Sequence, residues 1–214
     1  MSASIARWSL HARGLQCTRG DRLLFDGVEF DLANGGLLQV CGPNGSGKTS
    51  LLRIVCGLSQ PTAGEIQWNG SHIRALGEDY NQNLVYVGHL NGIKDELQVG
   101  ENLRFAAQLA GLDATEQALE AALSQFAFRD ALHLPCRFLS QGQKRRLALA
   151  RLRLAGHRAL WILDEPFAAL DAASIDIVRL VLEAHLRNGG MALLTTHQEV
   201  AIKARNPRRI ELKG

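Results

Sequence analysis

One uninterrupted run of eight residues has the types and the spacing that bind the phosphates of a nucleotide. It reads Gly42, Pro43, Asn44, Gly45, Ser46, Gly47, Lys48 and Thr49, with Ser50 directly after it, and it matches G-x-x-x-x-G-K-[ST] without a gap. Gly45 and Gly47 allow backbone conformations that bring N–H groups close to phosphate oxygens. Lys48 adds a positive charge at the β- and γ-phosphates, and the Thr49 hydroxyl is a ligand for Mg²⁺. The run therefore predicts a nucleoside triphosphate site.

Two acidic residues, Asp164 and Glu165, follow the apolar run 160–163. An acid at the carboxyl end of a buried strand is placed to hold Mg²⁺ through Thr49 or through water. If the bound triphosphate is hydrolysed, a water molecule must attack its terminal phosphate. The next carboxylate, Glu165, is the residue that we expect to polarise this water. A positioned general base contributes typically about 10²–10⁴-fold to a rate, so loss of Glu165 is expected to silence hydrolysis while nucleotide binding survives.

A third polar segment, LSQGQ at residues 139–143, stands before a basic and apolar run at 144–151. Ser140 occupies the position of a helix N-cap, where its hydroxyl and the following N–H groups form a second anion-binding end. Gly142 and Gln143 belong to the same candidate site. An ordinary capped amphipathic helix is the alternative, and the segment by itself does not decide between the two.

The phosphate-binding run needs a strand before it and a helix after it. The apolar residues Leu37, Leu38, Val40 and Cys41 predict the strand, and residues 49–55 predict a helix that ends before Gly57 and Pro61. The N-terminus of that helix carries roughly half a positive charge and points at the phosphates. A chance Gly-rich turn is the alternative, and the flanking strand and helix argue against it.

The rest of the chain alternates between strand-like and helical patterns. Strands are predicted at 15–18, 28–32 and 65–68 as a small antiparallel layer, at 84–87, and again at 159–164, 191–196 and 210–212, with a helix at 173–186. From about 99 to 154 the apolar residues recur at helical spacing, which interrupts the α/β alternation. This block predicts a helical subdomain.

Composition bounds the class of protein. The chain has 214 residues, is 46% hydrophobic and carries a formal net charge of +3, which suits one packed core and gives no sign of a nucleic-acid groove. No apolar run reaches the ~18 residues of a membrane span, so contact with a membrane is expected only through a partner. The four cysteines form no C-x-x-C pair, which leaves metal and redox roles without support.

Five motifs in one order resemble those of the ATP-binding cassette (ABC) family. They are the Walker A run at 42–49, the signature at 139–143, the Walker B strand at 160–165, the D-loop at 168–171 and the switch at 195–197. The resemblance implies an α/β fold of the P-loop NTPase (ABC ATPase) type, with a RecA-like core, an N-terminal antiparallel β layer and an inserted helical subdomain at about 93–155. It implies a single ATP-binding domain over residues 1–214.

The resemblance also implies roles for particular residues. ATP and Mg²⁺ are the expected ligands, and two copies are expected to form a homodimer in which Ser140 reaches the γ-phosphate held by the other copy. Asp171 of the D-loop is expected to cross the dimer interface, and His197 to sense the γ-phosphate.

Three positions depart from the usual ABC pattern. Gln141 stands where the signature has its first Gly, and His89 falls where the Q-loop has its Gln, counting back from LQVGEN at 97–102. A histidine there keeps one hydrogen bond, but its charge can change near neutral pH. Arg19 lies where an aromatic residue stacks on adenine, and its planar guanidinium is expected to stack instead.

A narrower resemblance rests on residues 80–89, on GIK at 92–94 and on LWILDEPF at 160–167. These segments are similar to the ATP-binding subunits of the bacterial cytochrome c maturation system. That resemblance implies a peripheral subunit on the cytoplasmic face of the inner membrane, paired with permease subunits of the CcmB, CcmC and CcmD type. Its ATP hydrolysis would drive haem export or release of a haem-loaded chaperone.

Other functions stay open at this point. An ABC exporter of another cargo and a soluble, non-transport ABC ATPase both retain the motifs at 42–49 and 160–165. A GTPase is disfavoured because the chain has no N-K-x-D motif, and residues 91–94 carry Asn and Lys in the wrong order.

Overall fold

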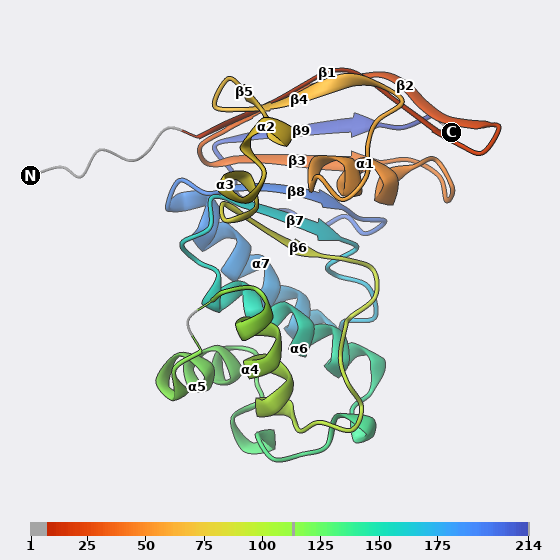
Figure 1. The fold of residues 1–214 in the computed structure, drawn as a ribbon. Helices are drawn as coiled ribbons and strands as arrows, with labels where there is room; N and C mark the ends of the chain where they lie inside the picture. The colour runs from red at the N-terminus through yellow and green to blue at the C-terminus, as the bar shows by residue number, and fades with distance from the viewer. Residues whose placement is uncertain (1–7, 113, 214) are drawn as a thin grey trace, which may run out of the picture.

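The computed structural model describes residues 8–112 and 114–213. Two sheets and a layer of helices build the molecule, and the helix α1 (Lys48–Val55) lies between the two sheets (Figure 1). This arrangement is that of the predicted α/β fold, with an antiparallel layer ahead of a parallel core.

The first sheet is antiparallel and has the strand order β2-β1-β4-β5. Its strands are β1 (Ser9–Arg19), β2 (Arg22–Ala33), β4 (Ala63–Trp68) and β5 (Ser71–His72). Gly20 adopts a φ of +58° in the tight turn between β1 and β2, a conformation that glycine reaches without strain. The predicted layer is confirmed, although both strands of the hairpin are longer than predicted because their exposed faces carry polar residues.

The second sheet is parallel, with the order β6-β7-β8-β3-β9. Its strands are β3 (Gly36–Cys41), β6 (Leu84–Val87), β7 (Leu160–Asp164), β8 (Met191–Thr195) and β9 (Asn206–Glu211). Every residue of β7 and β8 is buried, as expected for a parallel sheet that is covered on both faces. Ile162 packs on the α1 side, and Trp161 and Leu163 pack on the opposite side. Because the strands are parallel, β3, β7 and β8 end at one common edge.

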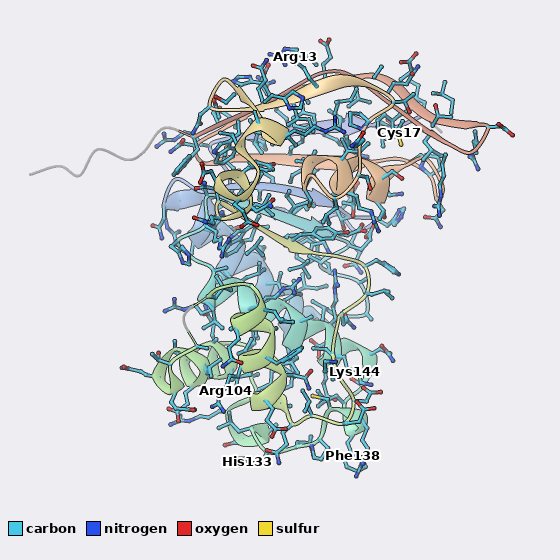
Figure 2. All side chains as sticks on the ribbon, viewed as in Figure 1. Arg13, Cys17, Arg104, His133, Phe138 and Lys144 are labelled. Atoms are coloured by element: carbon cyan, nitrogen blue, oxygen red, sulfur yellow. The ribbon has the colours of Figure 1, made fainter. Side chains whose placement is uncertain are left out.

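The helices α4 (Val99–Leu109), α5 (Glu116–Gln125) and α6 (Gln141–Leu154) form the far layer together with the 3₁₀ turns η1 (Arg129–Ala131) and η2 (Cys136–Phe138). They all fall in the predicted helical block. The helix α7 (Ala172–Arg187) packs against α6 and β8. Figure 2 shows Arg104, His133, Phe138 and Lys144 on this helical layer, far from Arg13 and Cys17 on the first sheet.

Two helices, α2 (Ile73–Leu76) and α3 (Glu78–Asn81), were not expected from the sequence. Each is four residues long, which is too short to show a helical period. None of the helices in the described ranges has both the length and the apolar character needed to cross a bilayer.

Candidate active site

The phosphate-binding loop joins β3 to α1, as the sequence predicts. Gly47 is the N-cap of α1 with a φ of 96°, and a Cβ at this position would lie 2.9 Å from the Phe25 ring. The loop therefore needs glycine both for its conformation and for its packing. The Lys48 ammonium donates to the carbonyl oxygens of Gly42 (2.8 Å) and Pro43 (3.0 Å). Phosphate oxygens are stronger acceptors than these neutral carbonyls, so a triphosphate competes well for the ammonium.

The carboxylate of Asp164, at the end of β7, joins two elements. Its Oδ2 accepts a hydrogen bond from Thr49 Oγ1 of α1 (2.8 Å), and its Oδ1 accepts one from Thr195 Oγ1 of β8 (2.7 Å). Asp164 and Thr195 also pair directly in the β7–β8 register. The predicted pair of oxygen ligands, Thr49 and Asp164, is thus brought together across 115 residues of sequence.

Glu165 and His197 face each other at the same edge. The His197 backbone N–H donates to Glu165 Oε2 (3.2 Å), and His197 Nε2 lies 3.4 Å from Oε1. Oε1 is buried and accepts no hydrogen bond. A carboxylate that a backbone N–H holds in place at the end of a buried strand is suited to accept a proton from a water molecule.

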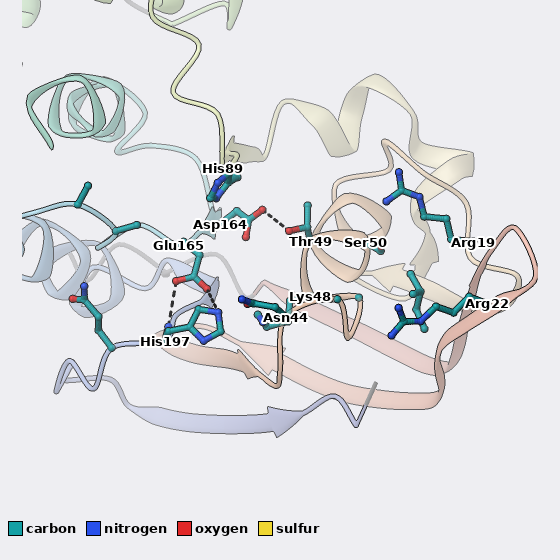
Figure 3. Close-up of a pocket in the computed structure, with 16 residues that line it drawn as sticks. Arg19, Arg22, Asn44, Lys48, Thr49, Ser50, His89, Asp164, Glu165 and His197 are labelled. Carbon is teal, nitrogen blue, oxygen red and sulfur yellow. Dashed lines mark hydrogen bonds and ion pairs between the residues drawn. The ribbon is translucent and has the colours of Figure 1, made fainter. Parts of the chain in front are cut away.

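One cavity of about 870 Å³ contains these groups (Figure 3). The residues that line it include Arg19, Arg22, Asn44, Gly45, Gly47, Lys48, Thr49, Ser50, His89, Asp164, Glu165, His197 and Gln198. A volume in this range holds a nucleotide-sized ligand. The cavity therefore brings together the predicted loop, the acids, His89, His197 and Arg19.

Ser46, Gly42 and Pro43 support the loop from outside this cavity. Ser46 is 1% exposed, and its hydroxyl has no hydrogen-bond partner. Gly42 has a φ of 138°, and a Cβ there would lie 2.5 Å from the Leu212 carbonyl oxygen.

The signature segment forms the start of α6 and does not line the cavity of its own chain. Ser140 is the N-cap: its Oγ accepts from Gln143 N–H (3.2 Å), while Gln143 Oε1 accepts from Ser140 N–H (2.8 Å). This reciprocal pair is a capping box. Gln141, the departure from the family pattern, is exposed, whereas a Cβ at Gly142 would lie 2.3 Å from the Ala169 carbonyl oxygen. The second glycine of the motif is therefore the one that the packing requires.

Asp171 also lies away from the cavity, at the N-cap of α7, where its Oδ1 accepts from Ser174 N–H (2.8 Å). Its hydrogen bonds with Ser174 lower the pKa of this carboxyl. Within one chain, Asp171 caps a helix; its expected place at a dimer interface stays a prediction.

Three residues of this site were missed by sequence reasoning. Arg22 lines the cavity beside Arg19, and its guanidinium comes within 3.9 Å of the position that a Cβ on Gly45 would occupy. Thr195 connects β8 to Asp164, and Arg145 of α6 is a buried cation whose bonds reach the end of β7. Thr195 carried a usable signal, since it ends a predicted strand next to the Walker B strand; Arg145 carried none beyond its charge.

Comparison with known proteins agrees with this geometry. The pattern of the ABC transporter family matches residues 25–168. A putative ABC transporter ATP-binding protein from Pyrococcus furiosus has the same fold, with a TM-score of 0.80 at 24% identity over 95% of this chain and 97% of that one. A dimeric ATP-binding cassette solved with ADP and phosphate superposes with a TM-score of 0.75 at 21% identity, covering 88% of each chain.

The chain is therefore an ATP-hydrolysing protein of the ABC transporter family. A nearer relative narrows the class: the cytochrome c biogenesis ATP-binding export protein CcmA of Nitrosospira multiformis is 50% identical over 95% of this chain and 98% of its own length. At that identity and coverage, the chain belongs to the family of cytochrome c biogenesis ATP-binding export proteins.

Proposed function

We propose that this chain hydrolyses Mg²⁺-ATP with Glu165 as the general base. The observation that carries the proposal is the position of Glu165: its carboxylate accepts from the His197 N–H, and the residue lines the cavity that also contains Lys48 and Thr49. In this proposal Lys48 leaves the carbonyls of Gly42 and Pro43 to bind the β- and γ-phosphates, and His197 holds the Glu165 carboxylate in position.

Thr49 and Asp164 are the residues that would hold Mg²⁺. Their oxygens are hard donors 2.8 Å apart, and no group of three His, Cys, Asp or Glu clusters as a metal site in the part of the chain that the structure describes. Mg²⁺ is bound by one or two carboxylates together with substrate phosphates, so this sparse donor set fits it. When bound, the ion neutralises phosphate charge that develops during transfer.

The active form in this proposal is a homodimer. Ser140, Gly142, Gln143 and Asp171 lie outside the cavity of their own chain, although Ser140 presents a helix N-terminus suited to anions. A second copy that supplies this end would close the first copy's site. The dimeric ATP-binding cassette of similar fold, solved with ADP and phosphate, supports the arrangement.

Each copy is proposed to act as one ATP-binding domain over residues 1–214, with residues 93–155 as its helical subdomain. It would sit on the cytoplasmic face of the bacterial inner membrane and dock onto permease subunits of the CcmB, CcmC and CcmD type. The cargo would be haem, or a haem-loaded chaperone awaiting release. The name of the 50% identical relative, an export protein of cytochrome c biogenesis, supports this. Two exposed apolar side chains, Leu90 beside His89 and Phe138 on η2, support the docking onto permease subunits. They lie on connected segments, because the Arg137 N–H next to Phe138 donates to the Asp95 carbonyl of the loop that carries Leu90 (3.0 Å).

The test is Glu165→Gln in the complex purified with its membrane subunits. Hydrolysis is expected to fall about 10²–10⁴-fold while ATP binding persists, and an ATP-bound dimer should accumulate on a sizing column. Hydrolysis at the wild-type rate by Glu165→Gln, or by a chain that stays monomeric, contradicts the proposal. Copurification with permeases of another transport system would leave the ATPase intact and remove haem as the cargo.

A further inference from the structure

Arg145 lies in the second turn of α6 and is 4% exposed. Its Nη1 donates to the Gly88 carbonyl (2.8 Å) and to Asn91 Oδ1 (3.2 Å), both in the loop that carries His89. Its Nη2 donates to the Glu165 carbonyl (2.9 Å) and to the Asp164 carbonyl. One guanidinium therefore joins the signature helix to both loops that face the nucleotide.

The backbone segment to which Arg145 donates hydrogen bonds is strained. Glu165 has a φ of 51°, a left-handed conformation that residues with a Cβ rarely adopt. Such a conformation persists only where surrounding bonds hold it. Here Thr195 Oγ1 accepts from the Glu165 N–H (2.9 Å). Arg145 donates to the carbonyl of the preceding residue, Asp164, and to the carbonyl of Glu165 itself.

We propose that Arg145 is a positioning residue for hydrolysis: it holds the Glu165 backbone in its left-handed conformation and makes that conformation depend on the His89 loop and on α6. The inference rests on the proposed role of Glu165 as the general base. Because Ser140 caps the same helix, engagement of Ser140 by the other copy's nucleotide would reach Glu165 through Arg145.

The side-chain chemistry explains why arginine suits this position. Its planar fork donates from two nitrogens at fixed angles, so each nitrogen serves one loop at the same time. A lysine keeps the charge but presents a single nitrogen, which reaches one loop or the other. Lysine is therefore expected to restore part of the effect.

Arg151 provides the matched control. It lies on the same helix, and burial lowers the pKa of its guanidinium to about 10. It donates to the Tyr86 carbonyl in β6 (2.5 Å), and the structure records no bond from it to Asp164 or Glu165 among the described residues. Loss of Arg151 removes a partly buried guanidinium and a bond from α6 to the sheet without touching the end of β7.

The experiment compares Arg145→Gln, Arg145→Lys and Arg151→Gln in the intact complex, with kcat, KM for ATP, nucleotide Kd and Tm measured for each. Misplacing a catalytic group by about 1 Å costs up to about 10²-fold in rate. Arg145→Gln is therefore expected to lower kcat about 10–100-fold with KM and Kd within about threefold of wild type. Arg145→Lys should recover part of kcat, and Arg151→Gln should keep kcat within about threefold at a similar Tm.

Equal losses of kcat in Arg145→Gln and Arg151→Gln would overturn the inference, as would a loss confined to Kd or Tm. If Arg145→Gln does not fold, Asn91→Ala replaces it: a fall in kcat of about two- to fivefold at unchanged Tm supports the link to the His89 loop, and an unchanged kcat contradicts it. Glu165→Gln separates the two proposals. If Glu165→Gln hydrolyses ATP at the wild-type rate, the proposed function is wrong. If Glu165→Gln is inactive but Arg145→Gln and Arg151→Gln lose kcat equally, only the inference about Arg145 is wrong.

Discussion

The edge where β3, β7 and β8 end differs from the start of α6 in how its polar groups are satisfied. At the strand edge, groups far apart in sequence serve one another: Thr49 and Thr195 both donate to Asp164, and His197 donates to Glu165. At the start of α6, the partners are three residues apart, since Ser140 and Gln143 satisfy each other. The first region depends on the whole fold, and the second depends on one helical turn.

This difference has a functional meaning. A site assembled from three elements of one chain is preorganised for its ligand and needs no partner to form. A helix end that satisfies itself and faces away from its own cavity is stable alone, yet it offers an anion-binding surface to another molecule. Hydrolysis is thus expected to need both regions, and nucleotide binding only the first.

Among the variants that test this comparison, the largest expected effect comes from Asp164→Asn, which removes the acceptor shared by Thr49 and Thr195 at the strand edge. The amide keeps the size of the side chain. It removes the negative charge that accepts the Thr49 hydrogen bond and that would bind Mg²⁺ in the proposed site. Loss of one such electrostatic contribution typically costs about 10²–10³-fold in kcat. Steady-state ATP hydrolysis measures it, with Asp176→Asn as control, because Asp176 is an exposed residue of α7 paired with Arg179. Similar rates for the two variants would contradict the role of Asp164.

A second prediction concerns the opposite ends of the same strands. His185 is buried, stacks on Trp161 with ring centroids 3.8 Å apart, and has Nε2 3.1 Å from the Met191 carbonyl oxygen. Desolvation lowers its pKa from 6.5 to about 4. The unfolded chain therefore binds the proton first, so stability is fully present above pH 6.5 and falls as the pH drops to about 4. The shift corresponds to about 3 kcal/mol of unfolding free energy.

Denaturant unfolding at a series of pH values measures this loss. His185→Gln keeps an N–H donor for the Met191 carbonyl and does not titrate, so its stability should vary less with pH in this window. His133→Gln, an exposed histidine that contacts Gln98, is the control and should retain the wild-type slope. Identical slopes in all three proteins would rule out His185 as the source.

A third prediction compares two glycines that occupy the second position of a helix. A Cβ on Gly142 of α6 would lie 2.3 Å from the Ala169 carbonyl oxygen, whereas one on Gly100 of α4 would lie 3.5 Å from the Leu132 carbonyl oxygen. Gly142→Ala is expected to destabilise the chain by about 1–3 kcal/mol through overpacking. Gly100→Ala is expected to stabilise it by up to about 1 kcal/mol, since alanine favours the helix. Thermal unfolding measures both, and equal shifts would contradict the close approach of α6 to the D-loop.

The same contrast explains what could be predicted from the sequence. The phosphate-binding loop and the Ser140 cap are local patterns whose chemistry follows from residue type and spacing, so both were identified, together with the strands and the helix around them. The strands at 159–164 and 191–196 were also predicted, but that β7 and β8 pair, so that Asp164 meets Thr195, is a finding of the structure.

The contacts of Arg145 could not be found in this way, and for Thr195 the sequence showed only its place at the end of a predicted strand. Arg145 bonds to residues 57 positions earlier and 20 positions later, and three of its four recorded partners are backbone carbonyls, which every residue carries. No residue type at those positions marks the contact. The hydroxyl of Thr195 acts because the β7–β8 register places it opposite Asp164, and a register is a property of the assembled sheet.

The smallest expected effect tests the start of α6. Ser140→Ala removes the hydroxyl that accepts from Gln143 N–H, and loss of such a cap costs about 1 kcal/mol of unfolding free energy. Thr115→Ala is the matched control, because Thr115 caps α5 by accepting from Ala118 N–H (3.4 Å) and lies outside the nucleotide cavity. The two variants should lose similar stability, and nucleotide Kd of the isolated chain should change in neither. In the assembled complex, however, Ser140→Ala should lower ATP hydrolysis about tenfold while Thr115→Ala leaves it unchanged, since only Ser140 is proposed to meet the other copy's nucleotide. Equal hydrolysis by the two variants would mean that the start of α6 is a helix cap and nothing more.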